Sequence, residues 1–130
     1  MILHELKTVA GATSKKHVLR TKADTFDKEM FRLAYDPNRM YNLKFNNSDW
    51  DTIKPLHDTD KVILDKLTNR EITGSAARNA VEEHCVIYGD LVKLICNKDL
   101  GCGVSVKTLI SVFGKGFVPT FEVALAEEAN

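Results

Sequence analysis

Apolar side chains recur every three to four residues along most of the chain, whereas strict apolar/polar alternation over five or more positions is hard to find. The first period is typical of amphipathic helices and the second of strands, so the pattern predicts an all-α fold. In the N-terminal half we expect helices over residues 2–10, from a cap at Thr13 or Ser14, from Thr25, and from a cap at Asp58 or Thr59. Further helices are expected after Thr73-Gly74-Ser75 up to Gly89, from a cap at Asp90, and between Gly103 and Gly114.

The helical pattern fades between residues 41 and 57, where asparagine, serine and proline mark a connector. Phe45, Trp50 and Ile53 within this connector are expected to pack on the core. We predict a single helical domain over residues 1–116. Residues 117–130 contain a proline and three acidic side chains, and we predict that they form a linker leaving the domain.

The composition is typical of a soluble globular domain, with 44% hydrophobic and 28% charged residues in a chain of 130. Cys85, Cys96 and Cys102 are odd in number and lack a C-x-x-C pair, so they are expected to be reduced core thiols. No apolar run is long enough to span a membrane, and Glu5 interrupts the stretch where a signal peptide would need an apolar core. We therefore expect a cytoplasmic protein without a membrane partner.

The formal net charge of +0 argues against a histone-like protein that binds nucleic acid through bulk charge. The charges are nevertheless uneven along the chain. Residues 1–45 hold nine basic and five acidic side chains, and residues 101–118 hold two basic and no acidic ones. These two segments could converge on one basic face, or they could be ordinary solvated helix faces.

Two expected helix starts have the composition of a phosphate-binding element. A helix N-terminus exposes unpaired backbone N–H groups and about half a positive charge, and glycine allows close approach to the backbone. In the segment from Asp99 to Thr108, the residues concerned are Gly101, Gly103, Ser105 and Lys107. The arrangement is repeated by Thr73, Gly74, Ser75 and Arg78. The alternative is that both segments are ordinary capped helix starts.

Two nucleotide-binding motifs are nearly matched. Gly101 to Thr108 fits the P-loop pattern G-x-x-x-x-G-K-[ST], except that Val106 replaces the second glycine and its branched Cβ would crowd the loop. Lys22-Ala-Asp24 is similar to the K-x-D-G of nucleotidyltransferases, but Thr25 replaces the glycine and we expect a helix end followed by a helix cap. The histidines and cysteines show no metal-ligand spacing, and His84 is expected to be a core histidine.

Three segments together resemble the N-terminal DNA-binding domain of ATP-dependent DNA ligases, most of all the T-even bacteriophage type. They are Met1-Ile-Leu3, Ile72-Thr-Gly-Ser-Ala-Ala77 and Asp99-Leu-Gly-Cys-Gly-Val-Ser-Val106, in the same order along nearly the whole chain. The most specific part is the Asp-Leu-x-x-Gly-Val/Ala-Ser element from Asp99 to Ser105. On this resemblance, residues 1–116 would be the DNA-binding domain.

The resemblance implies two pseudo-symmetric helical halves that lie across the minor groove on both sides of a nick. It implies phosphate contacts through Thr73, Gly74 and Ser75, through Gly101, Gly103, Val104, Ser105 and Lys107, and, more loosely, through Thr13, Ser14, Lys15 and Lys16. The expected partner is nicked double-stranded DNA without sequence preference. The expected state is a monomer, in the host cytoplasm if the protein is phage-encoded.

In that family, separate nucleotidyltransferase and OB-fold domains use ATP and Mg²⁺ to seal the nick. No K-x-D-G lysine follows within residues 117–130, so this chain alone is expected to be neither an enzyme nor a cofactor-binding protein. Gly101 stands where many relatives carry a charged residue, so we expect a weaker phosphate contact there. The alternative function is a stand-alone helical protein-interaction or DNA-binding module without ligase function.

Overall fold

The computed structural model describes residues 2–46 and 48–119, and within these ranges the chain is all-helical, without a strand. The predicted fold class is therefore confirmed. The helices are α1 (Ile2–Thr8), α2 (Ala12–Lys22), α3 (Thr25–Tyr35), α4 (Asp58–Thr68), α5 (Gly74–Tyr88), α6 (Leu91–Cys96) and α7 (Val106–Phe113). A short 3₁₀ helix, η1 (Trp50–Thr52), lies in the connector between α3 and α4.

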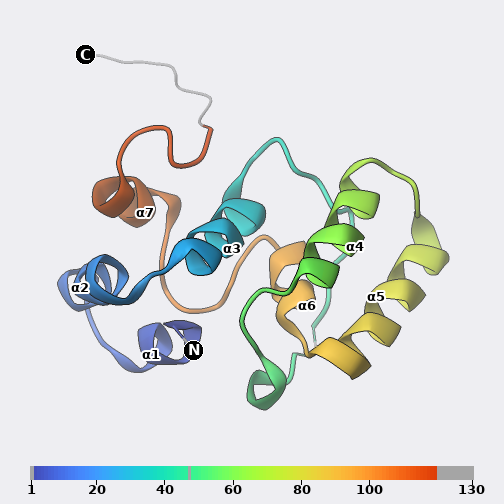
Figure 1. Ribbon diagram of the computed structural model, residues 1–130, viewed down its shortest axis with the longest axis horizontal. Helices are drawn as coiled ribbons and strands as arrows, with labels where there is room; N and C mark the ends of the chain where they lie inside the picture. The colour runs from blue at the N-terminus through green and yellow to red at the C-terminus, as the bar shows by residue number, and fades with distance from the viewer. Residues whose placement is uncertain (1, 47, 120–130) are drawn as a thin grey trace.

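The helices form two groups along the long axis of the molecule (Figure 1). Helices α1, α2 and α7 lie at one end, α4 and α5 lie at the other, and α3 and α6 lie between them. The last helix of the chain, α7, packs against α2, while α6 packs against both α3 and α5. Because α6 is central, the two groups share one continuous core.

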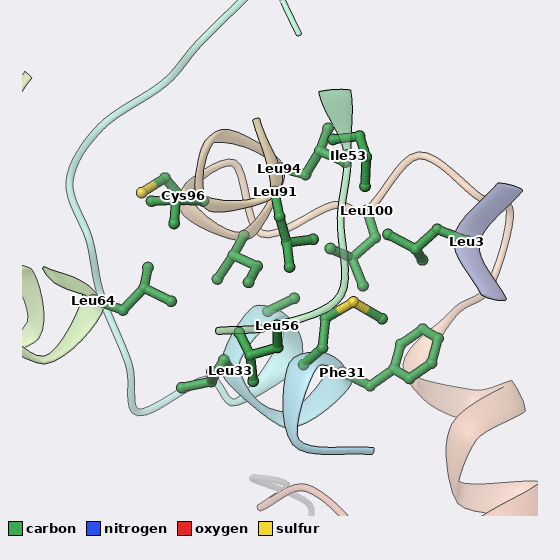
Figure 2. Packing of buried hydrophobic residues seen from close by; sticks show 14 of the residues in the cluster. Leu3, Phe31, Leu33, Ile53, Leu56, Leu64, Leu91, Leu94, Cys96 and Leu100 are labelled. Atoms are coloured by element: carbon green, nitrogen blue, oxygen red, sulfur yellow. The ribbon is translucent and has the colours of Figure 1, made fainter. Parts of the chain in front are cut away.

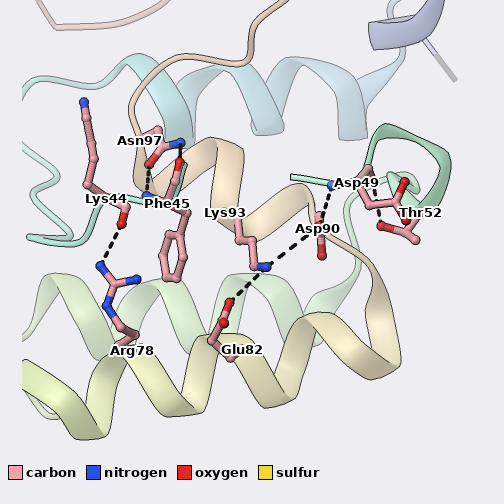
Figure 3. Close-up of polar contacts among 9 residues, drawn as sticks. All are labelled: Lys44, Phe45, Asp49, Thr52, Arg78, Glu82, Asp90, Lys93 and Asn97. Carbon is pink, nitrogen blue, oxygen red and sulfur yellow. Dashed lines mark hydrogen bonds and ion pairs between the residues drawn. The ribbon is translucent and has the colours of Figure 1, made fainter. Parts of the chain in front are cut away.

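The core is centred on α3 and α6, whose apolar faces meet (Figure 2). All six residues of α6 are buried. Phe31 of α3, Leu64 of α4, Ile95 of α6 and Leu100 after it are completely inaccessible to solvent. The burial of α6 on every side explains why five of its six residues are apolar; the exception, Lys93, pairs with Glu82 of α5 at 2.9 Å (Figure 3).

At three helix starts the residue predicted as the cap does not cap the helix through its side chain. Helix α2 begins at Ala12 directly after Gly11, so Thr13 and Ser14 lie in its first turn. Helix α4 is capped by His57, whose Nδ1 accepts from the backbone N–H of Thr59 at 3.1 Å. Asp90 is the N-cap residue of α6, as predicted, but its carboxylate accepts from the backbone N–H of Asp49 at 2.6 Å and makes no capping bond to α6 (Figure 3).

The connector is fixed to the core by its own backbone. Asn97 accepts from the backbone N–H of Phe45 at 2.7 Å and donates to the carbonyl of the same residue at 2.8 Å (Figure 3). Phe45 and Ile53 are buried as expected, and Trp50 is half-buried. The packing of Phe45 thus does not rest on apolar contacts alone.

The three cysteines are buried free thiols, as predicted. Burial raises the pKa of Cys85 and the pKa of Cys96 to about 12. Since the thiolate is the reactive form, neither side chain is suited to nucleophilic chemistry near neutral pH.

The packed part of the chain extends beyond the predicted boundary at residue 116. Phe117 and Val118 are 6% and 1% exposed, and the Arg32 guanidinium donates to the Phe117 carbonyl at 3.0 Å. Residues 117 and 118 therefore belong to the domain and not to a linker. The remainder of the predicted linker, residues 120–130, lies outside the described residues. No described helix is long and apolar enough to cross a membrane.

Candidate nucleic-acid interface

The start of α7 has the geometry of a capped helix N-terminus. Ser105 is its N-cap, and its Oγ accepts from the backbone N–H of Thr108 at 3.2 Å. The amides of Val106 and Lys107, the first two of the helix, have no carbonyl partner within it. Lys107 is exposed in this first turn, where no acidic residue opposes the positive end of the helix dipole. The arrangement suits an anion.

The loop that leads into α7, residues 99–104, is held from both sides. The Asp99 carboxylate accepts from the backbone N–H of Gly101 at 2.9 Å. The Tyr35 hydroxyl of α3 accepts from the Leu100 N–H at 3.3 Å and donates to the Val104 carbonyl at 3.1 Å. Burial raises the pKa of Tyr35 to about 12, so the phenol keeps the proton that it donates. Tyr35 therefore sets the path of this loop.

The two glycines of the loop suit both its backbone conformation and its close neighbours. A Cβ on Gly101 would lie 3.1 Å from the Trp50 ring carbon Cζ2, and one on Gly103 would lie 3.1 Å from Lys15 Cε. Both residues also have positive φ, at +69° and +75°. These glycines allow side chains of the protein itself to approach the loop, which is a different reason from the phosphate approach that the sequence indicated. Both remain exposed on the surface, whereas Val104 is buried and contributes to the core.

Lys15 joins the first turn of α2 to this loop. Its ammonium donates to the carbonyls of Leu6, Val9 and Cys102 at 2.6, 3.0 and 3.0 Å. Two of the predicted elements, residues 13–16 and residues 101–107, are thereby brought together at one end of the molecule (Figure 1). The three N–H bonds of Lys15 are all used inside the protein, so its role is positioning and not the direct phosphate contact that we expected.

Lys15→Met is expected to lower the free energy of unfolding by about 2 kcal/mol, because charge-assisted hydrogen bonds are lost while the aliphatic stem is kept. Urea denaturation followed by far-UV circular dichroism measures the change. Lys16→Met is the matched control, since Lys16 is the neighbouring, half-buried lysine and makes no hydrogen bond within the described structure. Equal stability of the two variants would show that the Lys15 contacts do not hold the loop.

The two helices at this junction carry an excess of basic side chains, of which Lys15 is bonded to three carbonyls and Lys22 is paired with Glu5. Helix α2 carries Lys15, Lys16, Arg20 and Lys22, helix α7 carries Lys107, and neither helix contains an acidic residue. Thr13 and Ser14 are exposed in the first turn of α2, which has no side-chain cap. The N-terminal amides of α2 therefore lie beside the loop with no carboxylate from their own helix.

The second predicted element, at the start of α5, lies at the opposite end of the molecule (Figure 1). Thr73, Gly74 and Ser75 are exposed there, and Thr73 forms no side-chain cap. Arg78 donates to the Lys44 carbonyl at 2.7 Å, and its guanidinium lies 4.7 Å from the Phe45 ring centroid (Figure 3). Arg78 thus already ties α5 to the connector.

The two elements are similar in sequence but differ in register. Lys107 is the second residue of α7, whereas Arg78 is the fifth residue of α5. Gly103 precedes the N-cap by two residues, whereas Gly74 is the first residue of its helix. The spacing between the glycine and the basic residue is therefore the same in both segments. Only Lys107, however, lies next to the free amides of the helix start.

The rival nucleotide sites lack the structures that they require. The stretch Leu91–Cys96 is a helix, whereas a P-loop follows a strand. Lys22 ends α2 and pairs with Glu5 at 2.6 Å, and Asp24 caps α3 by accepting from the Asp27 N–H at 2.8 Å. The prediction of a helix end and a helix cap is confirmed.

The histidine predicted to lie in the core lies at its margin, with its side chain 9% exposed. His84 Nε2 donates to the Asp60 carboxylate at 2.5 Å, and both side chains are buried. Within residues 2–46 and 48–119, no group of three or more histidine, cysteine, aspartate or glutamate residues is placed to hold a metal ion.

Sequence reasoning missed Tyr35 as a positioning residue and placed Trp50 in the core. Tyr35 is the last residue of an amphipathic helix, and its sequence gives no sign that its hydroxyl reaches a loop more than 60 positions away. Trp50 is the only tryptophan of the chain, and its contact with Gly101 depends on how the connector folds back.

Two solved structures are similar to this chain, and their names, "Pmar-Lig_Pre." and "Pmar-Lig_PreS3", mark them as ligase-related. Their TM-scores are 0.73 and 0.76, with 25% sequence identity over 85% and 91% of this chain. The chain spans 28% and 30% of their lengths, so it matches less than a third of each. No family model matches the chain, and no curated protein matches it. The fold is therefore an all-helical domain with ligase-related structural neighbours.

Proposed function

We propose that the chain is the DNA-binding domain of an ATP-dependent DNA ligase of the T-even bacteriophage type. In this proposal it binds nicked double-stranded DNA as a monomer, in the cytoplasm, without sequence preference. The observation that carries the proposal is the junction of the first turn of α2 with the loop leading into α7, between two helices with an excess of basic side chains, in a fold with ligase-related neighbours.

The chemistry of this junction suits a DNA backbone. The helix-start amides of α2 and α7, the hydroxyls of Thr13, Ser14 and Ser105, and the charges of Lys16 and Lys107 are all suited to bind phosphate oxygens. Phosphate contacts position a protein but carry no base information, so the recognition would be of duplex shape and continuity. The start of α5, at the other end of the molecule, would contact a second stretch of backbone.

The catalytic steps belong, in this proposal, to other domains of a longer protein. Those domains would bind ATP and Mg²⁺ and seal the nick during replication, repair or recombination, while this chain clamps the duplex. Lys22 of the K-x-D triplet is paired with Glu5 at a helix end, which supports assigning adenylation to another domain.

Binding to dye-labelled DNA tests the proposal by fluorescence anisotropy. We expect affinity for a nicked duplex that falls steeply as salt rises, because cations released from the phosphates drive the association. A protein-interaction module is the alternative, and exposed Val62, Val86 and Ile87 on α4 and α5 are the feature that favours it. An absence of DNA binding at low salt would refute the proposal.

Lys107→Ala and Arg78→Ala are each expected to weaken binding to nicked duplex equally for all sequences. Each variant should lower the slope of log K against log salt by about one unit, as for a lost phosphate contact. Lys66→Ala is the control, because Lys66 is an exposed lysine of α4, outside both predicted elements. Anisotropy titrations that are unchanged for both variants would contradict the assignment of these two helix starts.

A further inference from the structure

A half-buried tryptophan adjoins the loop at Gly101. The Trp50 ring carbon Cζ2 lies 3.1 Å from the position that a Cβ on Gly101 would occupy. The edge of the indole therefore packs directly on the glycine backbone. Because Trp50 is half-buried and Gly101 is exposed, part of the ring lies at the surface beside the loop.

Helix α1 holds this indole with two side chains. His4 Nε2 donates to the Trp50 carbonyl at 2.8 Å, and the two rings meet edge to face with centroids 5.7 Å apart. Lys7, in the last turn of α1, places its ammonium 3.9 Å from the Trp50 ring centroid. Lys7 is exposed and forms no ion pair with a carboxylate of the described residues. Its charge is thus presented over an aromatic plane.

Lys7, Trp50 and Gly101 form a contiguous strip contributed by three separate segments. One residue after Gly101, the Cys102 carbonyl is bonded to Lys15, so the strip continues into the junction of α2 and α7. Acidic residues border the strip on two sides: Asp99, whose carboxylate accepts from the Gly101 N–H, and Asp49 and Asp51, which flank Trp50 in the chain and are exposed. Lys7, held over the indole, is therefore the cation that this end of the strip offers to a phosphate.

We infer that the DNA-contact surface continues past Gly101 over Trp50 to Lys7. In this arrangement the Lys7 ammonium binds a backbone phosphate as a point charge, and the indole packs against the apolar face of the adjoining sugar. The inference rests on the proposed DNA-binding function and adds to it two residues that the sequence did not indicate. It also gives the half-buried Trp50 a ligand of defined chemistry, the deoxyribose-phosphate backbone.

The single tryptophan allows a direct test. Unlabelled nicked duplex is titrated into the chain while Trp50 emission and its quenching by acrylamide are followed, and anisotropy of labelled duplex is measured in parallel. We expect DNA to protect Trp50 from acrylamide with the same midpoint as the anisotropy change. Lys7→Ala should weaken binding by roughly three- to tenfold at low salt and lower the salt slope by about one unit. Lys66→Ala is again the control.

The outcomes separate this inference from the proposed function. One outcome is that anisotropy shows duplex binding, acrylamide quenches Trp50 equally with and without DNA, and Lys7→Ala binds DNA as tightly as the unmodified chain. In that case the inference is wrong and the proposed function stands. If no duplex binds at low salt, both the inference and the proposed function are wrong. Circular dichroism of Lys7→Ala confirms that the variant folds, as expected for a change at an exposed position.

Discussion

Gly89→Ala is expected to lower the free energy of unfolding by roughly 3–5 kcal/mol. Gly89 ends α5 with a φ of +94°, and a Cβ there would lie 2.0 Å from the Thr52 carbonyl oxygen. That oxygen belongs to η1, whose backbone is fixed by the hydrogen bond from the Asp49 N–H to the Asp90 carboxylate (Figure 3). The clash can be relieved only by moving η1 and the end of α5 apart. Urea denaturation followed by circular dichroism measures the loss.

Gly114→Ala provides a matched control for this prediction. Gly114 ends α7 in a similar conformation, with a φ of +103°, but nothing lies within 4 Å of a Cβ added to it. Its substitution should cost only the conformational penalty of an extended residue with positive φ, about 1–3 kcal/mol. If the two alanine variants are equally stable, the contact of η1 with α5 is not as close as the structure has it.

Asp60→Ala is expected to lower the free energy of unfolding by about 3 kcal/mol, because it removes one partner of a buried pair. Asp60 is 2% exposed, and its two oxygens accept from His84 Nε2 at 2.5 Å and from the His57 backbone N–H at 2.8 Å. The substitution therefore breaks the link between α4 and α5 and also loosens the start of α4. Thermal and urea denaturation both report the change.

Asp58→Ala is the control within the same helix turn. The Asp58 side chain is 86% exposed, and its contact with Lys61 is 3.4 Å long at the surface. Its removal should change stability by less than about 0.5 kcal/mol. A similar loss for both variants would mean that the charge near the start of α4 matters and the buried pair with His84 does not.

Helix positions were largely predictable, because each amphipathic helix carries its own apolar spacing. The stop of α5 at Gly89 and the stop of α7 at Gly114 follow from glycine at the C-cap. The start of α4 did not follow, because a histidine ring took the capping role that aspartate or threonine usually has. Caps depend on which side chain reaches the free amides, and that is decided partly by packing.

The candidate site was predicted in pieces and assembled only by the fold. The glycines and Lys107 were found because a helix start has a local signature. The role of Lys15 could not be found, because its three carbonyl partners come from α1, from the turn after it, and from a residue 87 positions away. The same is true of Trp50, whose neighbours Lys7 and Gly101 are remote in sequence.

The sequence by itself determined the helical class, the apolar faces that form the core and the two helix starts with a phosphate-binding composition, because these depend on neighbours a few residues apart. Only the tertiary structure decided that the start of α2 meets the loop before α7, that the start of α5 lies at the far end, and that the glycines make room for Trp50 and Lys15. Such contacts join residues that are distant in the chain, and no local period encodes which of them meet.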